Sequence, residues 1–208
     1  MVLLVRHGRT PTTGDVLPGR AAGLHLSDEG RAQAERAAQR IAELASGTGR
    51  AVAAVYASPL ERTVETARPI ARALGLAVRR DRGLLECDFG EWTGRPLREL
   101  VRERSWQTVQ HAPSSFRFPG GESFTELSAR MAGTLERLAG AHPGETVVAV
   151  SHADPIKAAV AAAAGTPLDL FQRLVVSPCS ISALALGHGG AHVLCVNSTA
   201  ALGELALS

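Results

Sequence analysis

The stretch VLLVRHG, residues 2–8, joins a short apolar run directly to an arginine, a histidine and a glycine. Four consecutive apolar residues of this kind predict a strand that is buried on both faces. Two later runs have the same character: AVAAVYAS, residues 51–58, and GETVVAV, residues 144–150. Polar or charged residues follow each run, so the sequence predicts three central strands whose ends bring side chains to one edge of a sheet.

Segments with apolar residues at helical spacing separate these strands. The predicted helices cover about 27–45, 60–74, 96–104, 122–140 and 155–164, and further strands are predicted at 76–80, 180–187 and 192–197. Strands that alternate with helices of this length form mainly parallel sheets covered on both faces. A short glycine-rich turn joins the last two strands and predicts a hairpin. The sequence therefore predicts an α/β fold: a three-layer α/β/α sandwich with a mainly parallel sheet and an antiparallel edge strand.

The chain length indicates how many cores can form. Its 208 residues, of which 45% are hydrophobic, suffice for one core. We therefore expect a single domain of residues 1–208, with residues about 93–121 as a cap over the site. Residues 105–121 contain Pro113, Pro119 and a pair of glycines, so they are expected to be irregular.

Charge and cysteine content narrow the class of protein. The formal net charge is only +2, so no basic surface for nucleic acid is predicted. No run of about 18 apolar residues is present for a membrane span. Cys87, Cys179 and Cys195 form no CxxC pair, and their odd number argues against a disulfide framework. We expect a cytoplasmic protein with no nucleic-acid partner and no membrane contact.

Chemically versatile side chains follow the predicted central strands. RHG, residues 6–8, follows the first, Arg62 lies just after the second, and SHA, residues 151–153, follows the third. Glu86 lies in the glycine-rich loop beyond the short strand at 76–80. Because ligands of open α/β sheets bind beyond the carboxyl ends of the strands, we expect these side chains to share one small volume.

This set of side chains matches the needs of phosphoryl transfer. The guanidinium groups of Arg6 and Arg62 would clamp a tetrahedral dianion. A histidine that is neutral at one ring nitrogen, such as His7, is a nucleophile, and His152 would add a donor to the phosphate oxygens. Glu86, kept protonated by the nearby phosphate, would donate a proton to the leaving oxygen. The sequence thus predicts transfer through a phosphohistidine.

Other reaction classes lack their motifs. The sequence has no HExxH and no Cys/His ligand spacing, so we expect no metal site. It has no GxxxxGK[ST] loop, no GxGxxG fingerprint and no GxSxG elbow, so we expect no nucleotide cofactor and no serine nucleophile. No cofactor of any kind is predicted.

Six motifs, in order along the chain, resemble those of a known family. They are RHGRT at 6–10, LSDEG at 26–30, SPLERTVETA at 58–67, LECDFGEWTG at 85–94, PGGES at 119–123 and SHA at 151–153. Together they resemble the signature of the histidine phosphatase superfamily, in its phosphoglycerate-mutase-like branch (branch 1). The resemblance spans residues from about 2 to 200 and implies a three-layer α/β/α fold that needs no metal.

The resemblance also implies a role for each central residue. His7 would be the phosphorylated nucleophile. Glu86 would be the proton donor and later the base that activates water, with Asp88 and Glu91 as alternative carboxylates in the same loop. Arg6, Arg62 and His152 would line the phosphate pocket and complete the catalytic set.

Some positions beside this set depart from the family pattern. The predicted phosphate-binding positions are Arg6, Gly8, Thr13, Arg62, His152 and Ala153. Gly8 lacks a Cβ and would let the backbone approach the phosphate. Thr13 stands where the family often has an asparagine, and Ala153 stands in a glycine position. Arg9 also differs from the usual Glu or Gln, and the roles of Arg9 and Thr13 are left open.

The branch contains both phosphatases and mutases. A mutase must keep its phosphohistidine from water, which favours a longer lid than the segment between Glu86 and His152 provides. We therefore expect a metal-independent phosphomonoesterase that acts on a small phosphorylated metabolite, chosen by the cap at 93–121. The alternatives are a phosphoglycerate mutase or related phosphomutase and, in another class, a non-catalytic phospho-ligand-binding protein. A homodimer is possible.

Overall fold

The computed structural model describes residues 1–48, 51–187 and 189–199. Its strands are β1 (Val2–Arg6), β2 (Val52–Ala57), β3 (Val78–Arg80), β4 (Thr146–Ser151), β5 (Ile181–Gly187) and β6 (Gly190–Ser198). Its α-helices are α1 (Asp28–Thr48), α2 (Glu61–Ala73), α3 (Leu97–Leu100), α4 (Arg104–His111), α5 (Phe124–Ala141) and α6 (Ala153–Ala163). Within the described ranges, no helix is long and apolar enough to cross a membrane.

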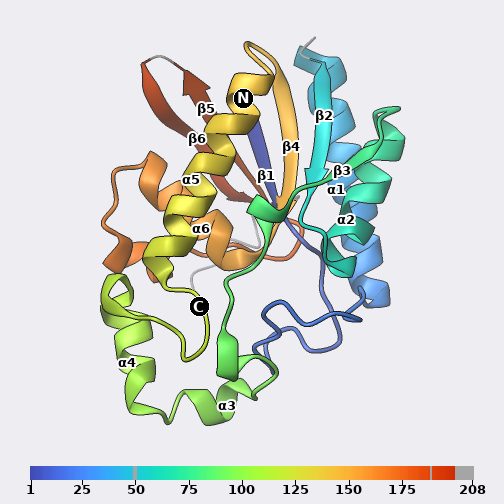
Figure 1. The fold of residues 1–208 in the computed structure, drawn as a ribbon. Helices are drawn as coiled ribbons and strands as arrows, with labels where there is room; N and C mark the ends of the chain where they lie inside the picture. Colours follow the sequence, from blue (N-terminus) through green and yellow to red (C-terminus); the bar gives the residue numbers. More distant parts are fainter. Residues whose placement is uncertain (49–50, 188, 200–208) are drawn as a thin grey trace.

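The strands form one six-stranded sheet in the order β3-β2-β4-β1-β5-β6. The neighbours β3, β2, β4 and β1 pair in parallel, whereas β5 runs antiparallel to β1 and β6 antiparallel to β5. Helices cover both faces of the sheet, with α1 and α2 on one side and α5 and α6 on the other (Figure 1). The predicted three-layer α/β/α class is confirmed, and its antiparallel edge consists of two strands.

The alternation of side chains along β1 explains the two helical layers. Val2 and Leu4 face a core formed with α5 and α6, while Leu3 and Val5 face a second core formed with α1 and α2. Successive side chains of a strand point to opposite faces, so a continuous apolar run needs cover on both. This requirement holds β1 in the middle of the sheet.

The helix before β4 begins with a strong local signal. The Ser123 hydroxyl accepts a hydrogen bond from the Glu126 amide, and the Glu126 carboxylate accepts one from the Ser123 amide. This capping box satisfies two amides that the first turn would leave unpaired. It fixes the start of α5 directly after the PGGES stretch and so places Glu122 beside the site.

The expectation of an irregular segment at 105–121 is wrong in part. Residues 104–111 form α4, because Trp106 and Val109 lie three positions apart and pack on an apolar cluster beneath the helix. The helix predicted at 96–104 is only the single turn α3. Two prolines and the glycine pair leave most of the remainder, up to residue 121, without a regular helix.

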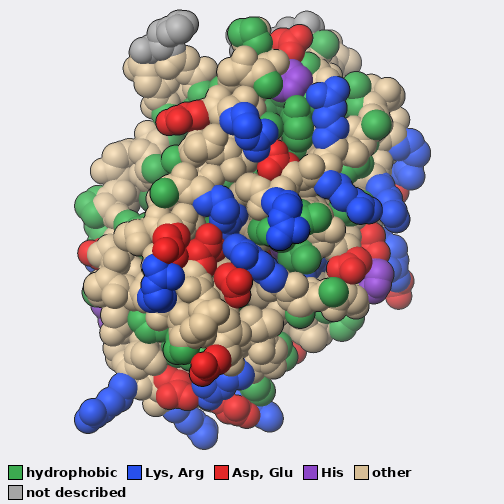
Figure 2. Space-filling view, in the orientation of Figure 1, with side chains coloured by type: hydrophobic (Ala, Val, Ile, Leu, Met, Phe, Trp, Pro, Cys, Tyr) green, Lys and Arg blue, Asp and Glu red, His purple; other side chains and the backbone are tan. Residues whose placement is uncertain are grey.

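The segment predicted as a cap lies past the carboxyl ends of the parallel strands, where Figure 1 shows α3 and α4 at the bottom of the molecule. Beneath it is a third apolar cluster that includes Phe89, Trp92, Phe118 and Phe124. In Figure 2 basic and acidic side chains lie side by side over the lower half of this face, without an extended area of one sign there. A single domain over 1–208 stays a prediction, since residues 200–208 lie outside the described part.

Candidate active site

The ends of β1, β2 and β4 meet at one edge of the sheet. Arg6 pairs in register with Ser151, and the His7 amide donates to the Ser151 carbonyl over 3.0 Å. The Ser58 amide, after β2, donates to the Val150 carbonyl over 3.0 Å. The rings of His7 and His152 consequently lie edge to face with centroids 5.2 Å apart.

His7 is held as a neutral imidazole with one free nitrogen. Its side chain is buried, and Nδ1 lies 2.8 Å from the Gly8 carbonyl oxygen. A carbonyl only accepts, so Nδ1 carries the proton and Nε2 keeps a lone pair. Burial, followed by the charges of Arg62 and Arg6, holds the pKa of His7 well below its usual value.

His152 is fully buried beside it, with its Nε2 2.9 Å from the Ser58 hydroxyl. Burial and the charge of Arg62 lower the pKa of His152 well below its usual value, so the ring is neutral. Its Nδ1 is buried and has no hydrogen-bond partner among the described residues. The second histidine therefore has one nitrogen fixed by serine and the other unsatisfied.

The two arginines leave several donors unsatisfied in the same way. Arg62, with 0% of its surface exposed, donates from Nη2 to the Gly19 carbonyl over 2.7 Å, and Arg6 donates from Nη1 to the Val176 carbonyl over 2.6 Å. Nε and Nη1 of Arg62 and Nε of Arg6 are buried and have no partner within the described ranges. Buried cationic donors without partners are costly, so this site is built for an anion.

Glu86 faces these cations as a buried carboxylic acid. Its Oε1 accepts the Cys87 amide over 2.9 Å, and 7% of the residue is exposed. Burial and then the negative charge of Asp154 raise the pKa of Glu86 to about 7, against the opposing effects of Arg62 and Arg6. The carboxyl group is thus poised to donate or accept a proton near neutral pH.

Gly8 is required for a reason that the sequence did not reveal. A Cβ on Gly8 would lie 2.5 Å from the Gly30 carbonyl oxygen in the first turn of α1. The Gly8 amide already donates to the Thr66 hydroxyl over 3.0 Å. Close packing against α1 therefore explains this glycine, whereas the predicted reason was an approach of the backbone to the phosphate.

The remaining predicted positions lie around this centre. The Thr13 hydroxyl accepts the Thr10 amide over 2.8 Å and lies 2.9 Å from the Thr10 hydroxyl, which closes the turn after β1. Ala153 is half-buried at the first position of α6. Arg9 is exposed and lies 3.4 Å from Glu29. Their part in binding stays a prediction.

Sequence reasoning missed the partners that hold the central groups in place. Ser58 belongs to the SPLERTVETA motif, and its hydroxyl lies 2.9 Å from Nε2 of His152. Asp154, one residue beyond the predicted SHA motif, influences Glu86. The position of Ser58 at a strand end was the available signal, since such ends carry the site residues of α/β sheets.

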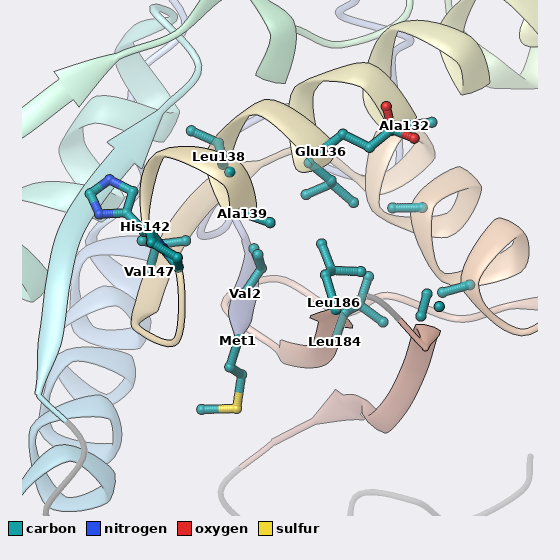
Figure 3. Close-up of a pocket in the computed structure, with 18 of the residues that line it drawn as sticks. Met1, Val2, Ala132, Glu136, Leu138, Ala139, His142, Val147, Leu184 and Leu186 are labelled. Atoms are coloured by element: carbon teal, nitrogen blue, oxygen red, sulfur yellow. The ribbon is translucent and has the colours of Figure 1, made fainter.

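A cavity of the described part of the chain lies away from this site. A space of about 710 Å³ lies between α5, α6, the first residues of β1 and β4, and the β5–β6 hairpin. Figure 3 shows the aliphatic side chains of Val2, Leu138, Val147 and Leu184 around it. Val2 and Val147 lie at the starts of their strands, so the cavity is at the opposite edge of the sheet from His7.

Across the described part of the chain, no group of three or more His, Cys, Asp and Glu side chains is arranged to hold a metal ion.

Comparison with known proteins decides the family. The model of the histidine phosphatase superfamily (branch 1) matches residues 2–199. This chain belongs to the histidine phosphatase superfamily. The family predicted from the six motifs is confirmed.

Members of the histidine phosphatase superfamily with curated names resemble the chain over most of its length. It is 32% identical over 208 residues to phosphoserine phosphatase 1 of Hydrogenobacter thermophilus, which covers 98% of this chain and 94% of the relative. It is 34% identical over 184 residues to the probable phosphoglycerate mutase GpmB of Cronobacter sakazakii, covering 87% and 82%. Three mycobacterial relatives, 33% identical, are longer, and the chain spans 54% of their length.

A solved structure of the superfamily shares the fold closely. Phosphoserine phosphatase from Entamoeba histolytica, in complex with 3-phosphoglyceric acid, superposes with a TM-score of 0.83 at 25% identity. The match covers 96% of this chain and 97% of that one. The architecture of the sheet and its helices is therefore that of a histidine phosphatase.

Proposed function

We propose that the protein is a metal-independent phosphomonoesterase that acts through a phosphohistidine on His7. One observation carries the proposal: buried nitrogen atoms of Arg6, Arg62 and His152 that have no hydrogen-bond partner in the described part of the chain lie beside a neutral histidine whose Nε2 keeps its lone pair. A phosphate dianion would satisfy those donors and present its phosphorus to the nucleophile. Family membership and the named phosphatase among its relatives support the same reaction.

The first step transfers the phosphoryl group to the protein. Nε2 of His7 attacks phosphorus, the N–P bond forms as the P–O bond breaks, and the Glu86 carboxyl gives its proton to the leaving oxygen. The Nδ1 proton stays on the ring. It donates a hydrogen bond to the Gly8 carbonyl oxygen, which stabilises the positive charge of the phosphorylated imidazole. Arg6 and Arg62 neutralise the charge that spreads over the phosphate oxygens.

The second step returns the phosphoryl group to water. The Glu86 carboxylate takes a proton from a water molecule while the oxygen of that water attacks phosphorus. The N–P bond breaks and releases phosphate and neutral His7. In both steps the Ser58 hydroxyl donates to Nε2 of His152, so Nδ1 of that ring carries the proton that faces the phosphate. His152 thereby acts as a neutral donor.

The substrate that we propose is a small phosphorylated metabolite. A second cavity, of about 140 Å³, is lined by Phe89, Trp106, Phe118 and Asp154, among others, and Asp154 is also the residue whose charge acts on Glu86. It would accept a small alcohol against aromatic walls, with Asp154 available to a hydrogen-bond donor of that alcohol. The phosphoserine phosphatase relative makes phosphoserine the first substrate to assay.

A phosphoglycerate mutase is the second candidate, because the probable mutase GpmB is 34% identical. The two functions differ in their product. A mutase would convert 3-phosphoglycerate to 2-phosphoglycerate, and a phosphatase would release inorganic phosphate from it.

We also propose that the protein acts in the cytoplasm as a homodimer. The free thiols of Cys87, Cys179 and Cys195 support a reducing compartment.

The direct test is hydrolysis of p-nitrophenyl phosphate in the presence of a chelator. The wild-type protein should turn over without added metal, and His7→Ala should lower kcat by at least about a thousandfold. His192→Ala, an exposed histidine on β6, is the matched control and should retain activity. A wild-type protein that is inactive, or active only with metal, would refute the proposal.

A further inference from the structure

Three charged side chains outside the phosphate site meet behind the loop that carries Glu86. Arg20 comes from the loop after β1, Glu122 from the PGGES stretch and Arg130 from α5. We call this set the Arg20–Glu122–Arg130 network. Its members come from three separate parts of the chain, and no role was predicted for any of them from the sequence, although Glu122 belongs to the PGGES motif.

Both arginines bind the backbone around Glu86. Arg20 Nε donates to the Glu86 carbonyl over 2.9 Å. Arg130 Nη1 donates to the carbonyls of Gly83 and Leu85 over 2.8 and 2.9 Å, and its Nη2 reaches the Glu86 carbonyl at 3.4 Å. The peptide units on either side of the Glu86 α-carbon are therefore fixed by guanidinium groups.

Glu122 holds the two arginines in these positions. Its carboxylate accepts Arg130 Nε over 2.8 Å and Nη2 over 2.9 Å, a bidentate pair, and it accepts Arg20 Nη2 over 3.0 Å. The same carboxylate lies 3.3 Å from the Asp88 amide, two residues beyond Glu86. The Glu122 side chain is only 13% exposed, so solvent screens these interactions weakly.

The target of these bonds is the main chain of the residue whose carboxyl group must reach the leaving oxygen. A general acid acts only within hydrogen-bond reach of the atom that it protonates. Misplacement by about 1 Å can cost about a hundredfold in rate. A network that only stabilised the fold would have no need to converge on the carbonyls at 83, 85 and 86.

We infer that the Arg20–Glu122–Arg130 network is a positioning device that aims Glu86 at the leaving group. Glu122 is its central residue, because its carboxylate accepts hydrogen bonds from both arginines. The inference rests on the proposed function, in which Glu86 is the proton donor. It assigns Glu122, Arg20 and Arg130 no contact with the substrate.

The test is the dependence of kcat/KM on the leaving group in Glu122→Gln. Because kcat/KM reports the steps up to transfer of the phosphoryl group to His7, it isolates proton donation from the second step, in which Glu86 is the base. Proton donation matters most for poor leaving groups, so kcat/KM should fall about 10- to 100-fold with an alkyl phosphate. It should change less than about threefold with 2,4-dinitrophenyl phosphate, whose leaving group needs no proton. Equal losses with both substrates would contradict positioning.

Asp81→Asn is the matched structural control. Asp81 pairs with Arg137 at the start of the same segment and accepts a hydrogen bond from the Gly83 amide, whereas the Arg20–Glu122–Arg130 network binds the carbonyls of residues 83, 85 and 86. Its loss should lower Tm with equal effects on both substrates. Arg20→Lys, at a half-buried position, provides a milder variant should Glu122→Gln fold poorly, and should show the same selective loss.

A double-mutant cycle separates this inference from the proposed function. In a Glu86→Gln background, Glu122→Gln should lower kcat/KM for the alkyl phosphate by less than about threefold, because the proton donor is already gone. Full additivity would overturn the positioning role. If wild-type protein hydrolyses no phosphate ester, or if Glu86→Gln shows no leaving-group selectivity, the proposed function or its acid fails instead.

Discussion

At the scale of single residues, the proposed mechanism depends on opposing pKa shifts. Burial and the two arginines keep His7 neutral, while burial keeps the Glu86 carboxyl protonated up to neutral pH. The proposed nucleophile and the proposed acid would thus be available together over the same pH range. Titratable groups whose environments push their pKa values in opposite directions are the usual basis for dividing acid and base roles.

The first prediction concerns the pH dependence of catalysis. The pKa of Glu86 is about 7, so its acid form prevails below that pH and kcat/KM for an alkyl phosphate should fall as pH rises through about 7. The low pKa of His7 should keep the nucleophile neutral well into the acid range. Steady-state kinetics at pH 4–9 measure this profile. If kcat/KM of Glu86→Gln still falls as pH rises through about 7, the titrating group is not Glu86.

The second prediction concerns stability at the same residue. The folded-state pKa of Glu86 is raised above its unfolded value, so its stabilising contribution is complete below about pH 4 and is lost as pH rises through about 7. Glu86→Gln should therefore raise the free energy of unfolding at pH 8 by on the order of 1–3 kcal/mol. Chemical denaturation at pH 4.5 and pH 8 measures it. An equal change at both pH values would contradict the linkage.

At the scale of elements, the site depends on how closely β1 packs against α1. Gly8, just after β1, packs closely against Gly30 in the first turn of α1. A Cβ on Gly8 would meet the Gly30 carbonyl, and a Cβ on Gly30 would meet the backbone of Arg9. The Gly8 amide also bonds to Thr66 on α2. The residue after the nucleophile is therefore fixed by two helices.

This packing gives the third prediction. Gly8→Ala should force β1 and α1 apart, destabilise the fold by about 1–3 kcal/mol and lower kcat by displacing His7. Gly133→Ala is the matched control, since open space surrounds that position on α5 and alanine favours the helix, and it should be neutral or slightly stabilising. Thermal unfolding and kcat with p-nitrophenyl phosphate measure both. Full activity in Gly8→Ala would contradict the packing argument.

The elements also show how far the sequence could be interpreted. Continuous apolar runs predicted parallel strands, and parallel strands bring their carboxyl ends together, so the meeting of His7 with His152 and Arg62 could be foreseen. The Arg20–Glu122–Arg130 network could not, because arginine is abundant here and hydrogen bonds to backbone carbonyls leave no pattern in sequence. Helix α4 was missed because helices this short are stabilised by tertiary packing.

At the scale of the whole molecule, the two edges of the sheet differ. The outer strand β3 exposes Arg79 and Arg80, and charge on an edge strand discourages pairing with another chain. The other outer strand, β6, has the sequence GAHVLCVNS with no Lys, Arg, Asp or Glu, and exposes Leu194 and Val196. The proposed homodimer is therefore best supported at β6, by antiparallel pairing across a twofold axis.

The fourth prediction tests that arrangement. Light scattering after gel filtration should give a dimer for the wild-type protein and a monomer for Leu194→Lys, because a buried charge in the interface would be unpaired. Leu44→Lys, at another exposed leucine, on α1, is the control and should remain dimeric. A monomeric wild-type protein, or a Leu194→Lys dimer, would remove the proposal while leaving the catalytic account intact.

The central claim is that His7 carries the phosphoryl group. Glu86→Gln lacks the base for the second step, so rapid mixing with 2,4-dinitrophenyl phosphate should accumulate the phosphorylated protein. Quenching in alkaline denaturant, proteolysis and mass spectrometry would locate the group. The account predicts one phosphoryl group on the peptide that contains His7, and none in Glu86→Gln combined with His7→Ala. A phosphoryl group on any other residue, or turnover with His7 unmodified throughout, would contradict it.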